Sequence, residues 1–331
     1  MGAGRPGRLG CRGDGGGHAG RGDAAADRPG RVERLTGGSH LLVTEWVQWP
    51  AWRRLVAIAR APVGRSAAAT GALAAASLAE LVEGLEEYAP EAYPQAVRTI
   101  AEELVERCAA VAPLLSLVNT VHLNLEAGPA ALAGELRRVE RRMAASAGIL
   151  ARVGAELIEE GGIVLTHGGS GSVQALLVQA AETRRFFVSC AATLPEGEGV
   201  ELAADLAAAG LAVEVTPDDQ VNEILPDVDL VIVGADALGP RRVMSTAGTP
   251  EIAAEARPLG VPFYVLASVD KVLPAPLFDR AVRAGRLGGR YEATDLGLIT
   301  AVVTERGVLD PREAAGLAED LEVSPVLLVD T

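Results

Sequence analysis

After Gly161 the sequence changes from a helical period to short apolar runs that alternate with amphipathic segments, and this change limits the folds open to the chain. Six runs suit strands: GIVLTH, RRFFVSC, LAVEVT, VDLVIVGAD, VPFYVLAS and LGLITAVVTE. Strands that are apolar throughout are typical of a parallel sheet whose two faces are both covered by helices. We therefore predict a doubly wound α/β domain with a parallel sheet over residues 161–331.

The half of the chain before Gly161 has apolar residues at the spacing of amphipathic helices. Helical segments are ALAAASLAELVEGLEEYA and YPQAVRTIAEELVERCAAVAPLL, followed by GPAALAGELRRVERRMAASAGILARVGAELIEEGG. The last of these reads as one long helix that stops at Gly161-Gly162. We predict an N-terminal all-helical domain over residues 41–160.

Residues 1–40 differ from both domains, because they hold seven arginines against four acidic residues and are rich in glycine. With almost no large apolar side chains they cannot offset the entropy of ordering the chain, so we expect a disordered extension. They also lack the continuous apolar core of a secretory signal.

Charge and composition exclude several classes of function. The net charge of −14 argues against nucleic acid as the main partner. No segment reads as a membrane span, and three scattered cysteines are too few for a disulfide framework or a zinc site. We expect a cytoplasmic protein without metal or cofactor, from a bacterium of high genomic GC content given its abundant Ala, Gly and Arg.

The stretch IVLTHGGSGSV, residues 163–173, reads as a strand, a glycine-rich turn and the start of a helix. Backbone N–H groups at such a turn can hold a phosphate, and the helix dipole favours negative charge there. The alternative is a tight turn capped by Ser170 or Ser172. The turn is neither a P-loop nor a dinucleotide fingerprint, because Gln174 stands where the third glycine is required.

Ligands of doubly wound sheets bind at the carboxyl ends of the strands, so the residues that follow each strand are the candidates. Asp236, after DLVIVGAD, is either an acid/base group with a raised pKa or a plain turn aspartate. His167 and Asp218 are as well explained by structural hydrogen bonds and helix capping, and Cys190 by a small buried hydrophobe. These residues do not make a complete catalytic set.

Several motifs together resemble one family. IVLTHGGSGSV, VTPDDQVNEILPDVDLVIVGAD, STAGT, VPFYVLASVDK and LITAVVTERGVL occur in an order similar to that of the translation initiation factor 2B alpha, beta and delta subunits. The related isomerases act on methylthioribose 1-phosphate or ribose 1,5-bisphosphate. The resemblance implies a helical domain followed by a Rossmann-like domain, and dimers or larger assemblies.

The resemblance also implies a catalytic cysteine and asparagine in the glycine turn, and here these positions are Gly168 and Gly169. The catalytic aspartate of the family matches Asp236, which is retained. An Asn-Lys pair that holds substrate falls on Ser245 and Thr246.

Two further positions bear on the ligand. An arginine suited to phosphate falls on Leu194, while Asp218 and Lys271 match positions that recur in the family. The ligand-binding residues that the resemblance implies are Thr166, His167, Gly168, Gly169, Ser170, Gly171, Asp218, Ser245, Thr246 and Lys271.

Three functional hypotheses remain open. The first is an initiation factor 2B-like protein that binds a sugar phosphate or nucleotide without catalysis, as a homodimer. The second is an aldose-to-ketose isomerase of sugar 1-phosphates that uses Asp236. The third is a structural or regulatory subunit of an oligomer.

Overall fold

The computed structural model describes residues 45–60, 66–287 and 289–328, so the predicted disordered extension lies outside the described residues. The α-helices are α1 Pro50–Arg60, α2 Ala67–Tyr88, α3 Tyr93–Cys108, α4 Ala112–Asn124, α5 Pro129–Ala155, α6 Gly171–Ala181, α7 Glu198–Ala208, α8 Val221–Ile224, α9 Thr249–Leu259, α10 Ala275–Leu287 and α11 Pro311–Glu319. The strands are β1 Ile163–Thr166, β2 Phe187–Ala191, β3 Ala212–Thr216, β4 Leu230–Gly234, β5 Ala237–Leu238, β6 Arg242–Thr246, β7 Phe263–Leu266, β8 Tyr291–Asp295, β9 Ala301–Thr304 and β10 Gly307–Leu309.

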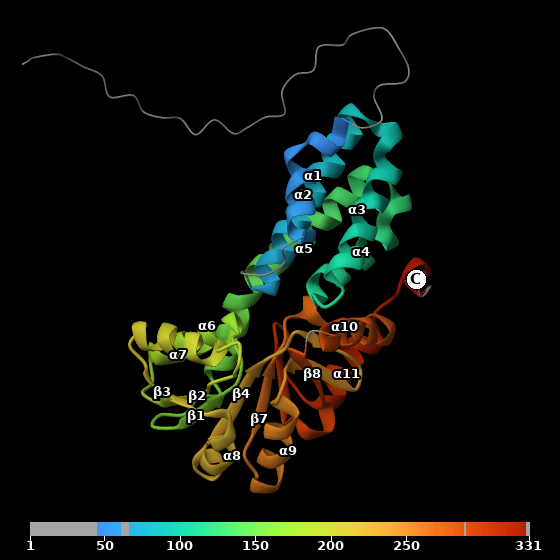
Figure 1. Ribbon diagram of the computed structural model, residues 1–331. Helices are drawn as coiled ribbons and strands as arrows, with labels where there is room; N and C mark the ends of the chain where they lie inside the picture. The colour runs from blue at the N-terminus through green and yellow to red at the C-terminus, as the bar shows by residue number, and fades with distance from the viewer. Residues whose placement is uncertain (1–44, 61–65, 288, 329–331) are drawn as a thin grey trace, which may run out of the picture. The chain divides into compact units, whose positions relative to one another are not determined.

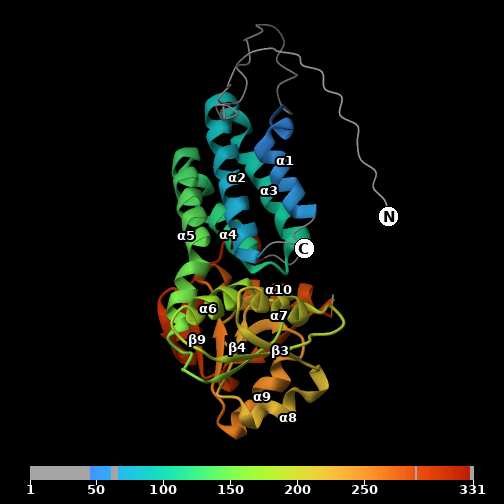
Figure 2. The ribbon, with the colours of Figure 1, turned by 90° about the vertical axis from the view of Figure 1, so that its left-hand side faces the viewer.

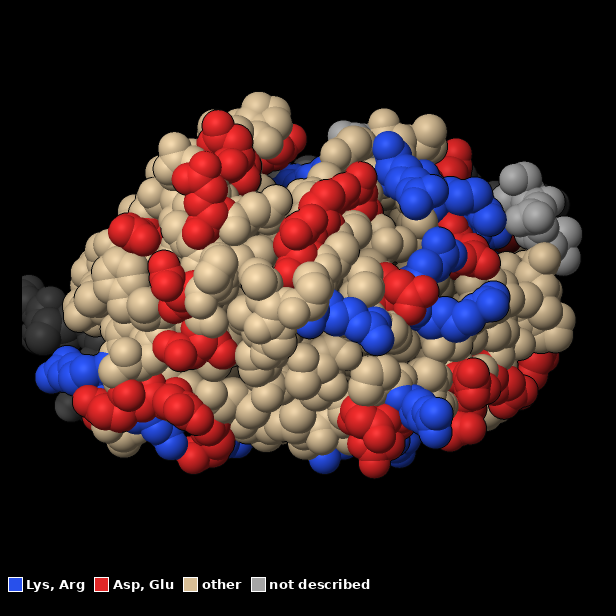
Figure 3. Space-filling view, turned by 90° about the horizontal axis from the view of Figure 1, so that it is seen from below, with Lys and Arg blue, Asp and Glu red and all other residues tan. Residues whose placement is uncertain are grey.

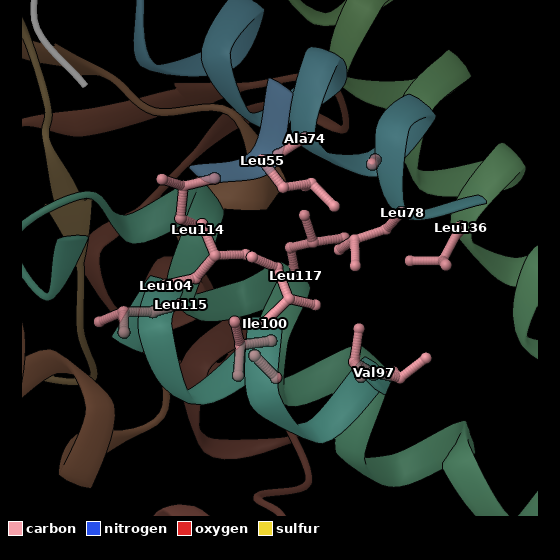
Figure 4. Packing of buried hydrophobic residues seen from close by; sticks show 14 of the residues in the cluster. Leu55, Ala74, Leu78, Val97, Ile100, Leu104, Leu114, Leu115, Leu117 and Leu136 are labelled. Carbon is pink, nitrogen blue, oxygen red and sulfur yellow. The ribbon is translucent and has the colours of Figure 1, made fainter. Parts of the chain in front are cut away.

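The region before the sheet is helical, as predicted, and α1 to α5 pack around one apolar core (Figure 4). Two details of the prediction are wrong. The second predicted helical segment is divided, because Val111 adopts an extended conformation and caps α4. The long helix ends at Ala155 and not at Gly161, since a turn in which the Leu157 N–H donates to the Gly154 carbonyl follows it.

The expectation that no segment approaches a membrane span is also wrong for α2, which is long and apolar enough by length and composition. Of its most apolar window, 56% is buried inside the protein. Leu78, Leu81 and Leu85 of this helix are all completely buried in the core. A core helix passes the same test of length and apolarity, so α2 is weak evidence for a membrane.

The six predicted strands are confirmed and lie in one seven-stranded sheet of order β10-β9-β7-β4-β1-β2-β3. All neighbouring pairs are parallel except β9 with β10. β1 pairs with β2 on one side and with β4 on the other, so the strand order reverses between β1 and β4. A crevice forms at the carboxyl ends of strands where the order reverses, and this places the ligand site of such a fold.

Helices cover both faces of the central strands, which explains why these strands are apolar without alternation, whereas the edge strand β3 is mostly exposed (Figures 1 and 2). Val164 and Ile232 pack on the face covered by α6, α7 and the end of α5. Leu165 and Val231, one residue along, pack on the face covered by α8, α9 and α11.

A second sheet, of order β5-β6-β8, is antiparallel and was not predicted. Its first strand follows β4 directly, and its last strand follows α10. Met244 of β6 and Phe278 of α10 belong to the same apolar core as the helices α1 to α5. The helical region is thereby joined to the carboxyl-end side of the parallel sheet.

The contact between α5 and α6 yields a stability prediction. A Cβ added at Gly154 would lie 2.0 Å from Cδ1 of Leu176, which is completely buried. We expect Gly154→Ala to lower the free energy of unfolding by about 1–3 kcal/mol through overpacking. Gly148→Ala, on the same helix with nothing within 4 Å of its Cβ, should raise it by about 0.5–1 kcal/mol. Urea unfolding of the two variants measures both, and equal stability would contradict the packing.

Candidate functional site

A cavity of about 220 Å³ lies at the carboxyl ends of β1 and β4, where the strand order reverses. The turn after β1, residues 167–172, and the end of β4, residues 234–236, form one side of it. Thr246, Lys271, Arg290 and Tyr291 also line it, as do residues 66–68 and 110–111 from the helical region. The cavity is therefore built from both the parallel sheet and the helices before it.

The glycine turn leaves part of its backbone open to this cavity. The Gly168 N–H donates to Oγ1 of Thr193 at 3.1 Å, and the Gly169 N–H donates to Oε2 of Glu198 at 3.2 Å. Ser170 caps α6, because its hydroxyl accepts from the Val173 N–H. In the described part of the chain nothing accepts from the N–H groups of Gly171 and Ser172, as expected for a first helical turn.

Thr246 occupies the space that a side chain at position 168 would need. A Cβ there would lie 2.3 Å from Oγ1 of Thr246, and Gly168 has a φ of 79°, which favours glycine. The cysteine that the resemblance implies at this position therefore does not fit beside Thr246. Gly168 and Thr246, two positions at which the resemblance implies other residues, therefore lie in direct contact.

Asp236 and Lys271 both line the cavity, and each side chain is half-buried. Burial raises the pKa of the Asp236 carboxyl, and the charge of Lys271 partly offsets this. Burial lowers the pKa of Lys271, whose Nζ donates to the Ala235 carbonyl, while Asp236 and Glu305 oppose the shift. An enclosed carboxyl with a raised pKa can exchange a proton with a ligand.

His167 adds a neutral hydrogen-bond acceptor. Its Nδ1 lies 3.0 Å from Oγ1 of Thr249, whose single hydroxyl proton goes to the Thr246 carbonyl. The Thr249 oxygen must then accept from Nδ1–H of His167, which leaves Nε2 without a proton. The His167 side chain is buried, and this burial lowers its pKa, against the charge of Asp218. Residue 167 lines the cavity, so it offers the lone pair of Nε2 to a bound molecule.

Asp218 stabilises the turn at Thr193 and Leu194. Its two carboxylate oxygens accept from the N–H groups of Thr193 at 2.7 Å and Leu194 at 2.8 Å. Thr193 has a φ of 58°, a costly conformation for a β-branched residue, and these bonds hold it there. Asp218 lines a neighbouring cavity of about 300 Å³, and its contact with a ligand stays a prediction.

The other predicted residues divide into two groups. His167, the turn from Gly168 to Gly171, Thr246 and Lys271 are brought together with Asp236 around the first cavity. Thr166 and Ser245 are 1% exposed and do not line it, and their hydroxyls lack a partner among the described residues. Ser245 precedes Thr246 in β6, and successive strand side chains point to opposite faces.

Glu198, Arg290 and Tyr291 also line the cavity and were not predicted from the sequence. Glu198 is the first residue of α7, and its carboxylate forms an ion pair with Arg290. Its signal was weak: an acidic residue in the first turn of the helix after a rim strand. Tyr291 begins β8 of the small antiparallel sheet and Arg290 directly precedes it, and no rule about parallel strands could have found them.

Cys190, the other thiol considered, cannot replace the missing cysteine from where it lies. It is completely buried within β2 and does not line the cavity. Burial raises the pKa of its thiol to about 12, so the nucleophilic thiolate is disfavoured. No group of three or more metal-ligating side chains occurs in the described ranges of the chain.

Comparisons with known proteins agree with this architecture. Residues 69–284 match the model of the initiation factor 2 subunit family. An eIF-2B subunit 2-like translation initiation factor of Pyrococcus horikoshii is 31% identical over 182 residues, which cover 52% of this chain and 66% of that protein. A methylthioribose-1-phosphate isomerase of Syntrophotalea carbinolica is 29% identical over 315 residues, 82% of this chain and 92% of the enzyme. The chain thus spans just under two thirds of the first relative.

Solved structures show the same fold. The translation initiation factor eIF-2B of Pyrococcus horikoshii OT3 superposes with a TM-score of 0.65 at 25% identity, over 79% of this chain and 97% of that one. A chain of the tetrameric eIF2B-beta2-delta2 complex of Chaetomium thermophilum gives a TM-score of 0.66 at 21% identity, over 82% and 93%.

The role of Asp218 can be tested with its neighbour as control. We expect Asp218→Ala to lower the free energy of unfolding by about 1–3 kcal/mol, because two backbone N–H groups lose their acceptor. Asp219→Ala, an exposed residue next to it, should change stability by less than about 0.5 kcal/mol. Chemical unfolding measures both. Equal effects would show that the Thr193 turn does not depend on this carboxylate.

Proposed function

The chain belongs to the initiation factor 2 subunit family, and on that premise we propose that it binds a small phosphorylated ligand at the crevice between β1 and β4 without thiol catalysis. The ligand is a sugar phosphate or a nucleotide. The observation that carries the proposal concerns the N–H groups of Gly171 and Ser172 at the start of α6. They have no acceptor among the described residues, and both residues line the cavity.

Charge supports an anionic ligand. Lys271 and Arg290 are the cationic side chains that line this cavity within the described residues. Each donates hydrogen bonds suited to phosphate, Arg290 as a planar fork and Lys271 as a point charge. The cavity volume of about 220 Å³ suits a small molecule rather than a macromolecule.

The packing at the turn supports a function without thiol catalysis. Thr246 fills the space beside Gly168, so restoring a cysteine alone would not restore the chemistry of the isomerases. Nucleic acid is a poor partner for a chain of net charge −14, and acidic side chains interleave with basic ones over the face shown in Figure 3. We further propose that the protein acts in the cytoplasm and assembles as a homodimer.

The glycine turn offers a direct test, because Gly171 is the first residue of α6 and Ser170 before it is extended. Proline is favoured at a first helical position and tolerates an extended predecessor, so Gly171→Pro deletes one N–H while keeping the helix. We expect this variant to bind ribose 5-phosphate about tenfold more weakly than the unmodified protein. Gly171→Ala keeps the N–H and should bind as before; isothermal titration compares the three.

A broader screen tests the ligand class. Ribose 5-phosphate and AMP should each raise the free energy of unfolding, by about 2.7 kcal/mol at a hundredfold excess over the dissociation constant, and a thermal-shift assay detects this. Ribose and adenosine, which lack the phosphate, should not. Stabilisation by the unphosphorylated compounds to the same degree would reject a phosphate site.

A second candidate function is aldose-to-ketose isomerisation of a sugar 1-phosphate by Asp236. Two observations favour it: the raised pKa of Asp236 and the neutral His167 beside the same cavity. This reading predicts turnover of methylthioribose 1-phosphate or ribose 1,5-bisphosphate that Asp236→Asn reduces by a factor of about 10²–10⁴. Our proposal predicts no turnover in either protein. A ³¹P NMR time course decides between them, with unfolding curves to show that the variant is folded.

A further inference from the structure

Glu198 holds a carboxylate against the glycine turn. Its backbone is fixed by Gly199, since a Cβ at that position would lie 1.7 Å from the Ala191 carbonyl oxygen at the end of β2. Its side chain packs over Gly169, with 3.0 Å between the Glu198 Cβ and the place of a Cβ at Gly169. The start of α7 is thus held against the turn that begins α6, and the Glu198 side chain is 16% exposed.

Both oxygens of this carboxylate are engaged as the oxygens of a bound phosphate would be. Oε2 accepts from the Gly169 N–H at 3.2 Å, and Oε1 forms the ion pair with Arg290. Glu198 itself lines the cavity, next to the unengaged N–H groups of Gly171 and Ser172. An anion of the protein therefore lies at the edge of the proposed anion site.

Arg290 retains hydrogen-bonding capacity that its partner does not use. Its Nε is buried and has no acceptor among the described residues. The guanidinium carbon lies 5.7 Å from the centre of the Tyr291 ring, within the range of a cation–π interaction. A guanidinium can bind a phosphate through two parallel N–H bonds. In this structure the Nε–H of Arg290 donates to no acceptor among the described residues.

His167 independently indicates that the cavity is built for a ligand. Its side chain is 7% exposed, and Thr249 engages only Nδ1. The remaining nitrogen, Nε2, has no partner in the described part of the chain, although residue 167 lines the cavity. Nε2 is not enclosed on all sides, so the hydroxyl of a bound ligand can donate a hydrogen bond to it.

We propose that Glu198 is a built-in competitor for the ligand's phosphate, an inference that rests on the proposed function. A phosphate enters by taking the Gly169 N–H and Arg290 from Glu198. A phosphomonoester carries about −1.5 to −2 charges at pH 7, so it displaces a carboxylate where a neutral sugar or a monocarboxylate does not. Glu198 thus sets the class of ligand: a phosphate monoester whose sugar hydroxyl faces His167.

The test removes the charge of Glu198 and keeps its shape. We expect Glu198→Gln to lower the dissociation constants of inorganic phosphate and ribose 5-phosphate about tenfold, measured by isothermal titration calorimetry. Ribose, which lacks the phosphate, should give no binding signal with either protein. Glu201→Gln, one turn along α7 and exposed, is the matched control and should bind like the unmodified protein. In the double variant Glu198→Gln/Arg290→Gln, the tenfold gain in phosphate affinity should disappear. In the single variant that gain comes from Arg290, which Glu198 no longer holds.

Two other outcomes would contradict this inference, and they differ in what they mean for the proposed function. If the unmodified protein binds phosphate and Glu198→Gln binds it equally or more weakly, Glu198 is no competitor, while the proposed function stands. If neither protein binds either phosphate probe, the proposed function and this inference both fail. Glu198→Ala, which retains the Cβ packed on Gly169, repeats the test should the glutamine variant fold poorly, and it must also tighten phosphate binding.

Discussion

The parallel pairing of β1 with β2 on one side and β4 on the other creates the crevice on which the site depends. The connections after β1 and β4 run to opposite faces of the sheet, and this leaves room for a ligand at the carboxyl ends of the two strands. The same reversal brings the glycine turn after β1 beside Asp236 after β4, from segments far apart in the sequence. The helical region completes the enclosure, because it shares an apolar core with the small sheet and α10.

Within this crevice the side chains have adjusted to one another. Thr246 fills the space of a residue 168 side chain, so glycine there is a requirement of packing as well as of backbone conformation. Cations, an enclosed carboxyl and a neutral imidazole remain around the cavity, and Glu198 occupies part of the turn. This arrangement is consistent with the anion site that we propose, and Thr246 fills the space at position 168, where the resemblance implies a catalytic thiol.

The sequence predicted the parallel sheet and the rim because apolar strands followed by Gly, His and Asp residues can be recognised locally. The turn at 167–171 and Asp236 were found in this way, and they do meet. The small antiparallel sheet was missed, since β5 has two residues and β6 lacks a strong strand pattern. Arg290, which directly precedes β8 of that sheet, was missed with it. Asp218 showed a capping pattern, and the structure has it hold the Thr193 turn.

We propose that a phosphate binds on the backbone N–H groups that begin α6. The most direct measurement is an NMR titration of protein labelled with ¹⁵N-glycine and ¹⁵N-serine, with ribose 5-phosphate added to saturation. We expect the amide signals of Gly171 and Ser172 to shift markedly, together with that of Gly169 as its N–H leaves the Glu198 carboxylate. Saturable binding that leaves these three signals in place would contradict it.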